Sequence, residues 1–326
     1  MMRCRAAYRK RTGGLMKKPH LQKPVIAVVG PTATGKTALA VEIAKHLKTE
    51  VISADSQLVY RELDIGTAKP TEEEKQGIPH HMIDVVAPDE VFSAANYRDM
   101  AGRHLERLWA QGRVPVVAGG TGFYIRALLQ ADFIPDIPPN EAFRSAMNRL
   151  AEAEGSPALH QLLREKDPAR AEDLHPNDRV RVIRALEIIE ATGQPVPRQA
   201  QSKDLDVLWF GLTYQDRDLL RTLIDRRIEV MLSAGWLEEV ERLVNQYGPE
   251  AQALQVAHGY PELVQVVQGK RSLPDAVAQI QINIHQYARR QMTWFRSNRE
   301  IRWFERDRTP WEELLNCVRE SITLGE

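Results

Sequence analysis

Apolar positions follow two different patterns along the chain, and the change from one to the other divides it. In the first half, short and almost continuously apolar runs alternate with stretches in which apolar residues recur every three or four positions. The runs are typical of strands buried on both faces of a parallel sheet, and the periodic stretches are typical of amphipathic helices. We expect strands at 25–29, 50–54, 82–86 and 114–118, with helices at 36–47 and 94–111 between them. The first half therefore predicts an α/β core whose parallel sheet is covered by helices on both faces.

The middle of the chain loses the sheet pattern. A proline-rich cluster at 135–139 and a second breaker cluster at 193–197 enclose the stretch 140–192, which has helical periodicity alone. We therefore expect a small all-helical insertion domain at 135–200, between a first part of the core at 21–134 and a second, mostly helical part at 201–326. In that second part we expect a strand at 207–212, helices at 216–233, 237–246 and 274–296, and an edge strand at 301–304.

Composition narrows the class of protein without identifying its partner. Of the 326 residues, 43% are hydrophobic, and 44 basic residues balance 44 acidic ones, so overall charge gives no argument for a nucleic-acid ligand. The 2 cysteines, Cys4 and Cys317, argue against a disulfide framework and for a reducing compartment, which predicts a cytoplasmic protein. No apolar run approaches membrane-spanning length, and the 9 histidines show no metal-ligand spacing.

The first 20 residues differ from the rest because they carry seven basic side chains and no acidic one. They contain no apolar core, so they do not resemble a secretory signal. A basic arm that touches RNA is one interpretation of this segment. We favour the other, a disordered extension upstream of a start at Met16.

The first predicted strand ends in a glycine-rich loop that opens the first predicted helix. Residues 30–37 are Gly-Pro-Thr-Ala-Thr-Gly-Lys-Thr, which matches the P-loop pattern G-x-x-x-x-G-K-T in its required strand–loop–helix context. Such a loop directs backbone N–H groups at a di- or triphosphate, Lys36 adds a cation, and the Thr37 hydroxyl suits Mg²⁺. The fold class is therefore P-loop NTPase-like. The candidate diphosphate-binding residues are Gly30, Thr32, Ala33, Thr34, Gly35, Lys36 and Thr37.

Two other strand ends carry polar groups that we expect near the phosphates, because parallel strands present their carboxyl ends at one edge of the sheet. Asp55 could ligate Mg²⁺ through water or act as a general base, with an Asx turn as the structural alternative. Thr121, in a run of three glycines, could line the mouth of the site or cap a helix. The strand at 114–118 ends without the acidic residue typical of phosphoryl transfer, which argues against a kinase.

Three predicted helices carry arginine-rich faces. Each face suits a phosphate-rich ligand such as RNA or a diphosphate, and each also suits a solvated surface, which we favour for the helix at 178–187 taken alone. The residues are Arg181 and Arg184 on the helix at 178–187, Arg289, Thr293 and Arg296 on the long helix, and Arg217, Arg221, Arg226 and Arg227 on the helix at 216–233.

Six motifs in this order resemble the bacterial tRNA dimethylallyltransferase family, also called tRNA isopentenyltransferases, over about residues 24–304. The motifs lie at 30–37, 53–60, 64–70, 119–124, 177–187 and 289–296. The resemblance implies transfer of the dimethylallyl group of dimethylallyl diphosphate to N6 of the adenosine immediately 3′ of the tRNA anticodon. It also implies release of pyrophosphate, a requirement for Mg²⁺, and a helical insertion that reaches the anticodon stem. We expect a monomer.

The resemblance also implies roles for individual residues. Asp55 would accept the proton of the attacking amine, Thr121 would line the channel, and Arg217 would assist the leaving group, while Thr37 would hold the metal. Residues that match tRNA-contacting positions of the family are Asp55, Ser56, Gln57, Leu58, Thr121, Arg144, Val180, Arg181, Val182, Ile183, Arg184, Arg289, Arg290, Gln291, Thr293, Trp294 and Arg296. Two positions depart from the family pattern: Pro261 and His285 stand where a basic residue is usual.

Three other activities compete with this interpretation. An adenylate isopentenyltransferase would act on free AMP, but it would not need a helical insertion. A P-loop small-molecule kinase would turn over ATP. A GTPase-like RNA-binding module would carry a guanine-reading Asn/Thr-Lys-x-Asp motif, which we do not find in the sequence.

Overall fold

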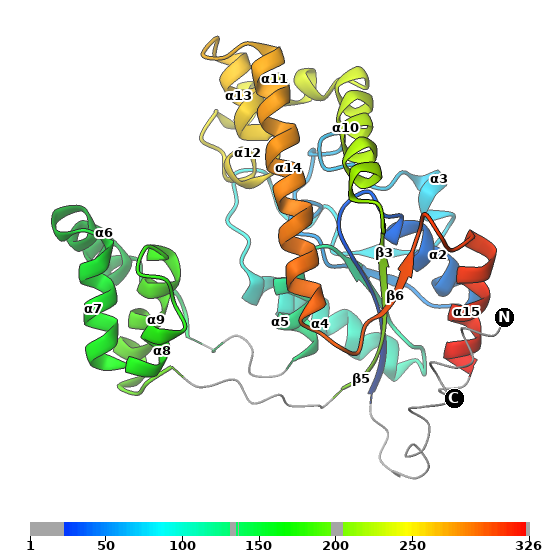
Figure 1. Cartoon of the computed structure of the whole chain (residues 1–326), viewed down its shortest axis with the longest axis horizontal. Coiled ribbons are helices and arrows are strands. Elements are labelled where there is room, and N and C mark those ends of the chain that lie inside the picture. Colours follow the sequence, from blue (N-terminus) through cyan, green and yellow to red (C-terminus); the bar gives the residue numbers. More distant parts are fainter. Residues whose placement is uncertain (1–22, 131–134, 136, 197–204, 324–326) are drawn as a thin grey trace. The chain divides into compact units, whose positions relative to one another are not determined.

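The computed structural model describes residues 23–130, 135, 137–196 and 205–323 (Figure 1). The basic extension at 1–20, with Cys4 and Met16, lies outside the described residues, as do parts of both breaker-rich segments. The chain divides into a core unit, Met1–Gln130 with Lys203–Glu326, and a helical unit, Ala131–Ser202.

The core unit is built on one six-stranded sheet in the order β3-β2-β4-β1-β5-β6. Every pair of neighbouring strands is parallel, which confirms the predicted α/β fold with a parallel sheet. In the central strands, Val29 is in register with Gly119 and Gly211, so the loops after these positions leave the sheet at the same edge. The strands are β1 (Lys23–Val29), β2 (Val51–Ser53), β3 (His80–His81), β4 (Val116–Gly119), β5 (Leu205–Thr213) and β6 (Arg302–Glu305).

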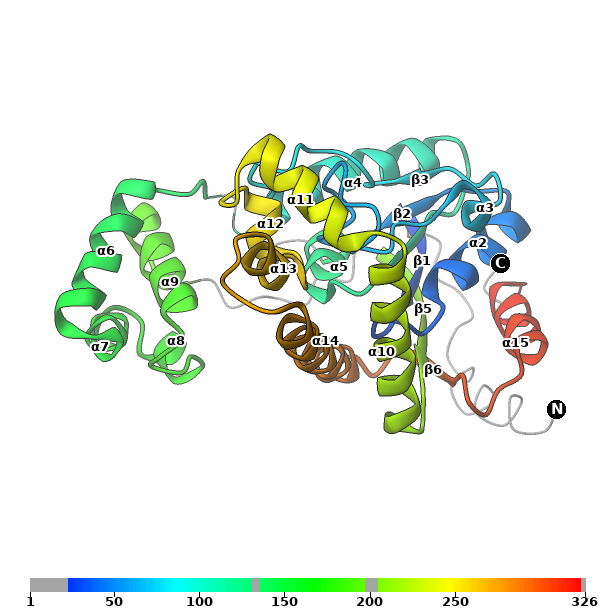
Figure 2. The ribbon, with the colours of Figure 1, turned by 90° about the horizontal axis from the view of Figure 1, so that it is seen from above.

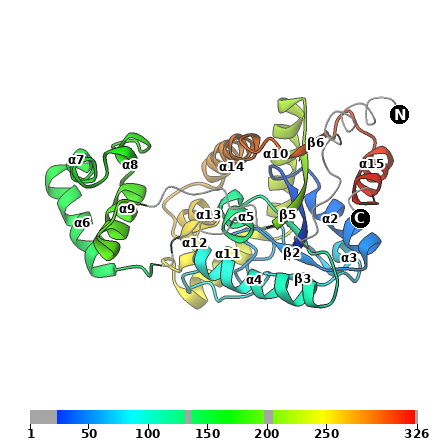
Figure 3. The same ribbon diagram turned by 90° about the horizontal axis from the view of Figure 1, so that it is seen from below.

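Helices cover both faces of this sheet, which explains the continuous apolar runs. Along β1, Val25, Ala27 and Val29 are buried in one core cluster, while Ile26 and Val28 are buried in the other. The larger cluster includes residues of α4, α5, α10, α11, α13 and α14, and the smaller one includes α2 and α15 (Figures 2 and 3). The helices are α2 (Lys36–Leu47), α3 (Glu72–Lys75), α4 (Ala94–Ala110), α5 (Gly122–Leu129), α10 (Arg217–Ser233), α11 (Trp236–Tyr247), α12 (Gln252–Val256), α13 (Tyr260–Val267), α14 (Leu273–Arg296) and α15 (Trp311–Thr323).

The strand expected at 82–86 was wrong. The strand is the short β3, and the chain bends after it, with positive φ at Met82 (64°) and Asp84 (57°). This segment lies against a loop rather than a strand: Asp84 N–H donates to Leu58 O (3.0 Å), and Val85 N–H donates to Val59 O (2.8 Å). The apolar pattern is the same for both arrangements, so the pattern alone could not distinguish them.

The helical unit has its own core. Leu159, Leu163, Val182 and Leu186 are at most 1% exposed and pack together. Its helices are α6 (Glu141–Glu154), α7 (Ser156–Lys166), α8 (Pro168–Glu172) and α9 (Arg179–Thr192).

One buried carboxylate, that of Glu187, organises the polar part of the helical unit. Arg144 donates to it from Nε (2.9 Å), Asn140 donates from its backbone N–H (2.6 Å), and Arg184 donates from Nη1. Burial alone would raise the pKa of Glu187, but these donors outweigh it and lower the pKa below the ordinary value. Arg144 and Arg184 therefore balance a charge inside the unit.

Candidate active site

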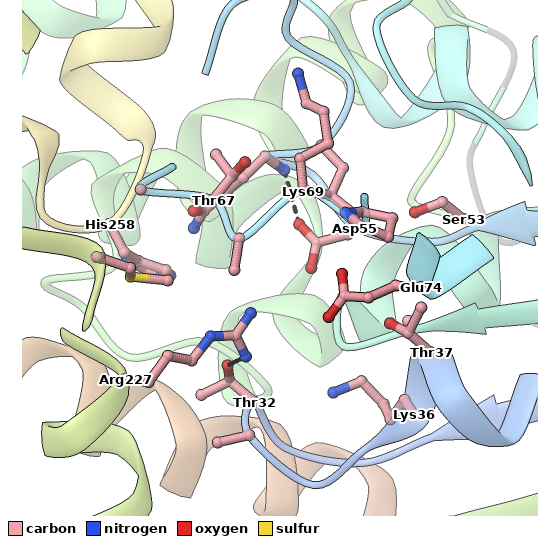
Figure 4. A pocket seen from close by; sticks show the side chains of 18 of the residues that line it. Thr32, Lys36, Thr37, Ser53, Asp55, Thr67, Lys69, Glu74, Arg227 and His258 are labelled. Atoms are coloured by element: carbon pink, nitrogen blue, oxygen red, sulfur yellow. Dashed lines mark hydrogen bonds between the residues drawn. The ribbon is translucent and has the colours of Figure 1, made fainter. Parts of the chain in front are cut away.

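A cavity of about 700 Å³ lies at the carboxyl edge of the sheet. Its walls come from the P-loop, the segment after β2, the loop from Asp64 to Thr71, and the helices α10 and α14. Figure 4 shows Asp55 with Thr67 and Lys69 on one side of it and Thr32 and Lys36 on the other. The edge of the sheet thus brings together segments that are far apart in the sequence, as expected for an open parallel sheet.

The P-loop has the geometry of a phosphate cradle. Gly30 has φ 142°, and a Cβ there would lie 2.2 Å from the Leu212 carbonyl oxygen, so this position requires glycine. Gly35 is left-handed at the N-terminus of α2, and the Thr34 hydroxyl donates to Pro31 O (2.9 Å) to close the loop. The N-terminal backbone N–H groups of α2 therefore lie at the cavity, where they favour an anion.

Lys36 is held inside this cradle. Its Nζ donates to Pro31 O (2.6 Å), which holds the ammonium group against the loop. Burial lowers the pKa of Lys36 to about 8; Asp55 counteracts this shift and Arg227 adds to it. A diphosphate would supply the negative charge that the buried ammonium group needs.

Asp55 stabilises the turn after β2 and also faces the cavity. Its Oδ1 accepts a hydrogen bond from Gln57 N–H (2.9 Å), which is the Asx-turn interaction, and its side chain also lines the cavity. The turn fixes the backbone and leaves Oδ2 to face the cavity. Asp55 can therefore form the Asx turn and still be available as a general base or as a metal ligand through water.

Thr121 links two turns of the site. Its hydroxyl accepts a hydrogen bond from Ser56 N–H (3.0 Å), and it makes no side-chain cap to α5. Tyr287 of α14 interacts through its hydroxyl with Thr121 and Gln291. Burial raises the pKa of Tyr287, so this hydroxyl stays protonated.

Gln291 of α14 joins the P-loop to the turn after β4. Its Oε1 accepts from Thr32 N–H (3.0 Å), and its Nε2 donates to Gly120 O (2.9 Å). A Cβ on Gly120 would lie 2.2 Å from Nε2, so only glycine leaves room for the bond. Gln291 is 5% exposed, and the expectation that it contacts RNA does not fit this burial.

The arginine that enters the cavity is Arg227, whereas Arg217 does not. Arg227 Nη1 lies 3.5 Å from the Thr32 hydroxyl, and burial lowers the pKa of its guanidinium group. Arg217 is exposed in the first turn of α10 and does not line the cavity. Ten residues of helix separate the two, or roughly 15 Å. The leaving-group role expected for Arg217 therefore does not fit its place, and Arg227 has the position that this role requires.

Comparison with known proteins decides the family. A family model described as IPP transferase matches residues 58–298. The chain belongs to the IPP transferase family. The matched range begins after the P-loop, so the phosphate cradle is an observation independent of that match.

Relatives of this IPP transferase family member cover almost its whole length. It is 42% identical to the tRNA dimethylallyltransferase of Caldanaerobacter subterraneus subsp. tengcongensis over 309 residues, which are 91% of this chain and 97% of the relative. It is 43% identical to the tRNA dimethylallyltransferase of Thermomicrobium roseum, with 92% of each chain covered.

Solved structures agree with these relatives. The full-length tRNA isopentenylpyrophosphate transferase from Bacillus halodurans has a TM-score of 0.70 and 38% identity, covering 92% of this chain and 96% of its own. A eukaryotic dimethylallyltransferase acting on tRNA has a TM-score of 0.76 and 26% identity, covering 87% and 74%.

Outside the cavity, a second depression of this IPP transferase lies between α5 and α14. Arg126, Arg289 and Arg290 give it positive charge, and Arg126 stacks over the Trp294 ring at 5.5 Å. Phe123, 45% exposed, meets Trp294 edge-on with ring centroids 6.4 Å apart. Basic groups beside aromatic rings suit single-stranded nucleic acid. Gln286, Thr293 and Ser297 complete the lining.

The expected RNA contacts of the helical unit separate into three groups. Val182 and Ile183 are buried in its core, so a contact between their side chains and RNA does not fit the structure. Val180 is 80% exposed, and Arg181 is exposed beside Asp178, at 3.5 Å. Arg144 and Arg184 make the bonds to Glu187 described above. Val180 and Arg181 are thus the exposed members of this set, whereas Arg144 and Arg184 are half-buried.

Lys69, His258 and Tyr287 line the cavity, although the sequence did not indicate it. Lys69 belongs to the motif at 64–70, and His258 lies three residues before Pro261. No pattern in the sequence indicated that they line the cavity.

Within the described residues, no cluster of three or more His, Cys, Asp or Glu side chains is arranged to hold a metal ion. No described helix is long and apolar enough to cross a membrane.

Proposed function

We propose that this chain transfers the dimethylallyl group of dimethylallyl diphosphate to N6 of the tRNA adenosine immediately 3′ of the anticodon and releases pyrophosphate. The observation that carries the proposal is that a phosphate cradle and a carboxylate, Asp55, face one cavity beside a basic, aromatic groove. The names of the relatives support the same activity.

The P-loop holds the diphosphate as a leaving group. The allylic C–O bond breaks and its electron pair stays on pyrophosphate, while a new bond forms between the allylic carbon and N6 of adenine. Lys36, Arg227 and the backbone N–H groups of the loop stabilise the negative charge that develops on the leaving oxygen.

Asp55 takes the proton that N6 gives up. The lone pair of an exocyclic adenine amine is delocalised into the ring, so the amine is a weak nucleophile. A carboxylate that accepts its proton during attack makes the lone pair available. Because the Asx turn fixes Asp55, little reorganisation is needed at that moment.

The donor set of the cradle also suits Mg²⁺. Thr37 lies in the first turn of α2 beside the cavity, where its hydroxyl would hold the ion together with diphosphate oxygens, which are the hard oxygen ligands that Mg²⁺ prefers. When bound, the ion neutralises charge on the departing pyrophosphate.

The target adenosine belongs to a stacked anticodon loop, so it must leave the stack to reach Asp55. Ser56 and Thr121, which are tied to each other, would border its path, with Gln57 and Leu58 at the cavity wall. The groove of Arg126, Arg289 and Arg290 would bind the neighbouring phosphates. Arg296, exposed at the end of α14, and Arg181 of the helical unit would extend these contacts to the stem.

Labelled dimethylallyl diphosphate tests the activity directly. Incubation with Mg²⁺ and either an unmodified anticodon stem-loop or free AMP should label the stem-loop alone. Label in AMP alone would indicate an adenylate isopentenyltransferase. Label in neither substrate, with ATP turning over instead, would indicate a kinase.

Removing Arg227 should weaken the enzyme far more than removing Arg217. We expect Arg227→Ala to lower kcat/KM by roughly 10²-fold, because a buried charge-assisted donor to the leaving group is lost. Arg217→Ala, on the same helix, should stay within about twofold because surface charges contribute little. Steady-state kinetics with the stem-loop measures both, and equal losses would contradict the assignment of Arg227.

Arg181, an exposed arginine of the helical unit, should make a pure phosphate contact. Arg181→Ala should weaken stem-loop binding and lower the slope of log K against log salt by about 1, without changing thermal stability. Arg184→Ala should instead lower the melting temperature, since it removes a donor from buried Glu187. An unchanged salt slope for Arg181→Ala would indicate that the Arg181 face of α9 is a solvated surface that does not contact RNA phosphates.

A further inference from the structure

One wall of the cavity is a loop without regular structure. Residues 64–71 all line the cavity, and Ala68 within them has a positive φ of 49°. A loop of this kind keeps one conformation only where its backbone polar groups are satisfied. The contacts of this loop therefore show what holds the wall in place.

A single carboxylate, Glu239 of α11, satisfies the first half of the loop. Its Oε2 accepts from the backbone N–H groups of Asp64 (2.9 Å) and Ile65 (2.8 Å), and its Oε1 accepts from Gly66 N–H (3.3 Å). Tyr260 donates its hydroxyl to Oε1 (2.6 Å). Glu239 is 6% exposed, so these four donors take the place of water around a buried charge.

The same face of α11 holds the loop at neighbouring points. Trp236 lies so close to Gly66 that a Cβ there would be 1.9 Å from the indole nitrogen. Further along the helix, Tyr247 donates to the Glu62 carboxylate (2.6 Å), and Arg242 donates to Glu62 O (3.1 Å). Helix α11 thus contacts one short segment, 62–66, along most of its length.

The second half of the loop is tied on its other side. Lys69 Nζ donates to Asp64 Oδ1 (2.6 Å), to Tyr60 O (3.1 Å) and to the Asp84 carboxylate. Its ammonium group therefore bonds to the carboxylate of Asp64, the first residue whose N–H Glu239 accepts. A change at Glu239 would reach Lys69 through Asp64.

The diphosphate side of the cavity is held by other groups. Gln291 and the P-loop's own bonds fix Thr32 and Lys36, and among the described residues Glu239 forms no hydrogen bond with either of them. In Figure 4, Thr67 and Lys69 lie on the far side of Asp55 from Lys36. The loop therefore faces the space in which the acceptor base would meet Asp55.

We infer that Glu239 is a positioning residue that fixes the 64–69 wall of the cavity for the acceptor base and leaves the diphosphate site unaffected. The role in catalysis rests on the proposed function, whereas the hold on the loop does not. Glu239 does not line the cavity and acts through the backbone of Asp64, Ile65 and Gly66.

Glu239→Gln tests the inference, because glutamine keeps the size of the side chain but loses its charge and one acceptor oxygen. Hydrogen exchange at the amides of residues 64–66 should become at least about tenfold faster, since these bonds to a charged acceptor are lost or weakened. The value of kcat/KM for the stem-loop should fall by at least about tenfold. The Kd of inorganic pyrophosphate, which probes the cradle alone, should stay within about twofold.

Glu238→Gln is the matched control, because Glu238 is the exposed neighbour of Glu239 on the same helix. It should leave the exchange rates, kcat/KM and the pyrophosphate Kd unchanged. If Glu239→Gln does not fold, Tyr260→Phe removes one of the four donors and should give the same pattern with smaller amplitude.

Three results would overturn the inference. The first is unchanged hydrogen exchange at residues 64–66 in Glu239→Gln. The second is a pyrophosphate Kd that worsens in this variant as much as kcat/KM does. The third is a loss of kcat/KM in Glu238→Gln as large as the loss in Glu239→Gln. If the wild-type protein does not label the stem-loop, the proposed function fails, and the exchange and pyrophosphate measurements still decide whether Glu239 holds the loop.

Discussion

Turnover of Asp55→Asn should fall by at least about 10²-fold, the usual scale for loss of a general base. Asparagine keeps an oxygen that can accept the Gln57 N–H, so the Asx turn and the backbone around it remain. What disappears is the ability to take a proton from the adenine amine. The effect should therefore appear in kcat, with affinity for pyrophosphate retained.

Single-turnover kinetics with the stem-loop, together with pyrophosphate binding, measures this prediction. Asp55→Ala, which also breaks the turn, should be no more active than Asp55→Asn. Near-normal turnover of Asp55→Asn would exclude proton acceptance as the role of this side chain. A large loss of pyrophosphate binding would show instead that Asp55 acts mainly on the cradle.

Lys36→Met should have the second large effect, lowering kcat/KM for dimethylallyl diphosphate by about 10²–10³-fold, as for loss of one donor to a developing anion. The wild-type protein should also show the titration of this lysine. Because its pKa is lowered to about 8, Lys36 is charged below that pH and neutral above it. We expect kcat/KM for the donor to fall toward a tenfold loss per pH unit above about pH 8.

The pH profile of kcat/KM and the kinetics of the variants measure this prediction. Lys36→Arg keeps its charge in alkaline solution, so its activity, though lower, should not show the fall above pH 8. Lys45→Met, in the last turn of the same helix, is the matched control and should behave as wild type. A flat alkaline profile in the wild type would mean that Lys36 stays charged and that burial does not lower its pKa.

Helices with a regular apolar stripe could be predicted from sequence to within a residue or two. The helix expected at 36–47 is α2, and those expected at 216–233 and 274–296 are α10 and α14 with ends shifted by one residue. Segment 82–86 could not be predicted in this way, because its bonds go to the loop at 58–59. Those partners are set by tertiary structure and leave no local pattern.

The phosphate cradle, Asp55 and Thr121 could be predicted because strand ends of a parallel sheet converge. The choice between Arg217 and Arg227 could not, since sequence does not say which turn of α10 passes over the P-loop. Glu239 does have a signal in the sequence, because it lies in the buried stripe of α11 with Trp236, Val240 and Leu243. An acidic residue in an apolar stripe needs hydrogen-bond donors, and here backbone N–H groups in the wall of the cavity supply them.

Because of Gln291, helix α14 contributes to both proposed binding sites, the cradle for the diphosphate and the groove for RNA. This helix carries arginines toward the groove on its outer surface and, through Gln291, supports the Thr32 N–H of the cradle on its inner side. A displacement of α14 by RNA would alter the P-loop, and a diphosphate that stiffens the P-loop would alter how α14 receives RNA. By thermodynamic linkage the two affinities must change by the same factor, so the order in which the substrates bind would leave the overall coupling unchanged.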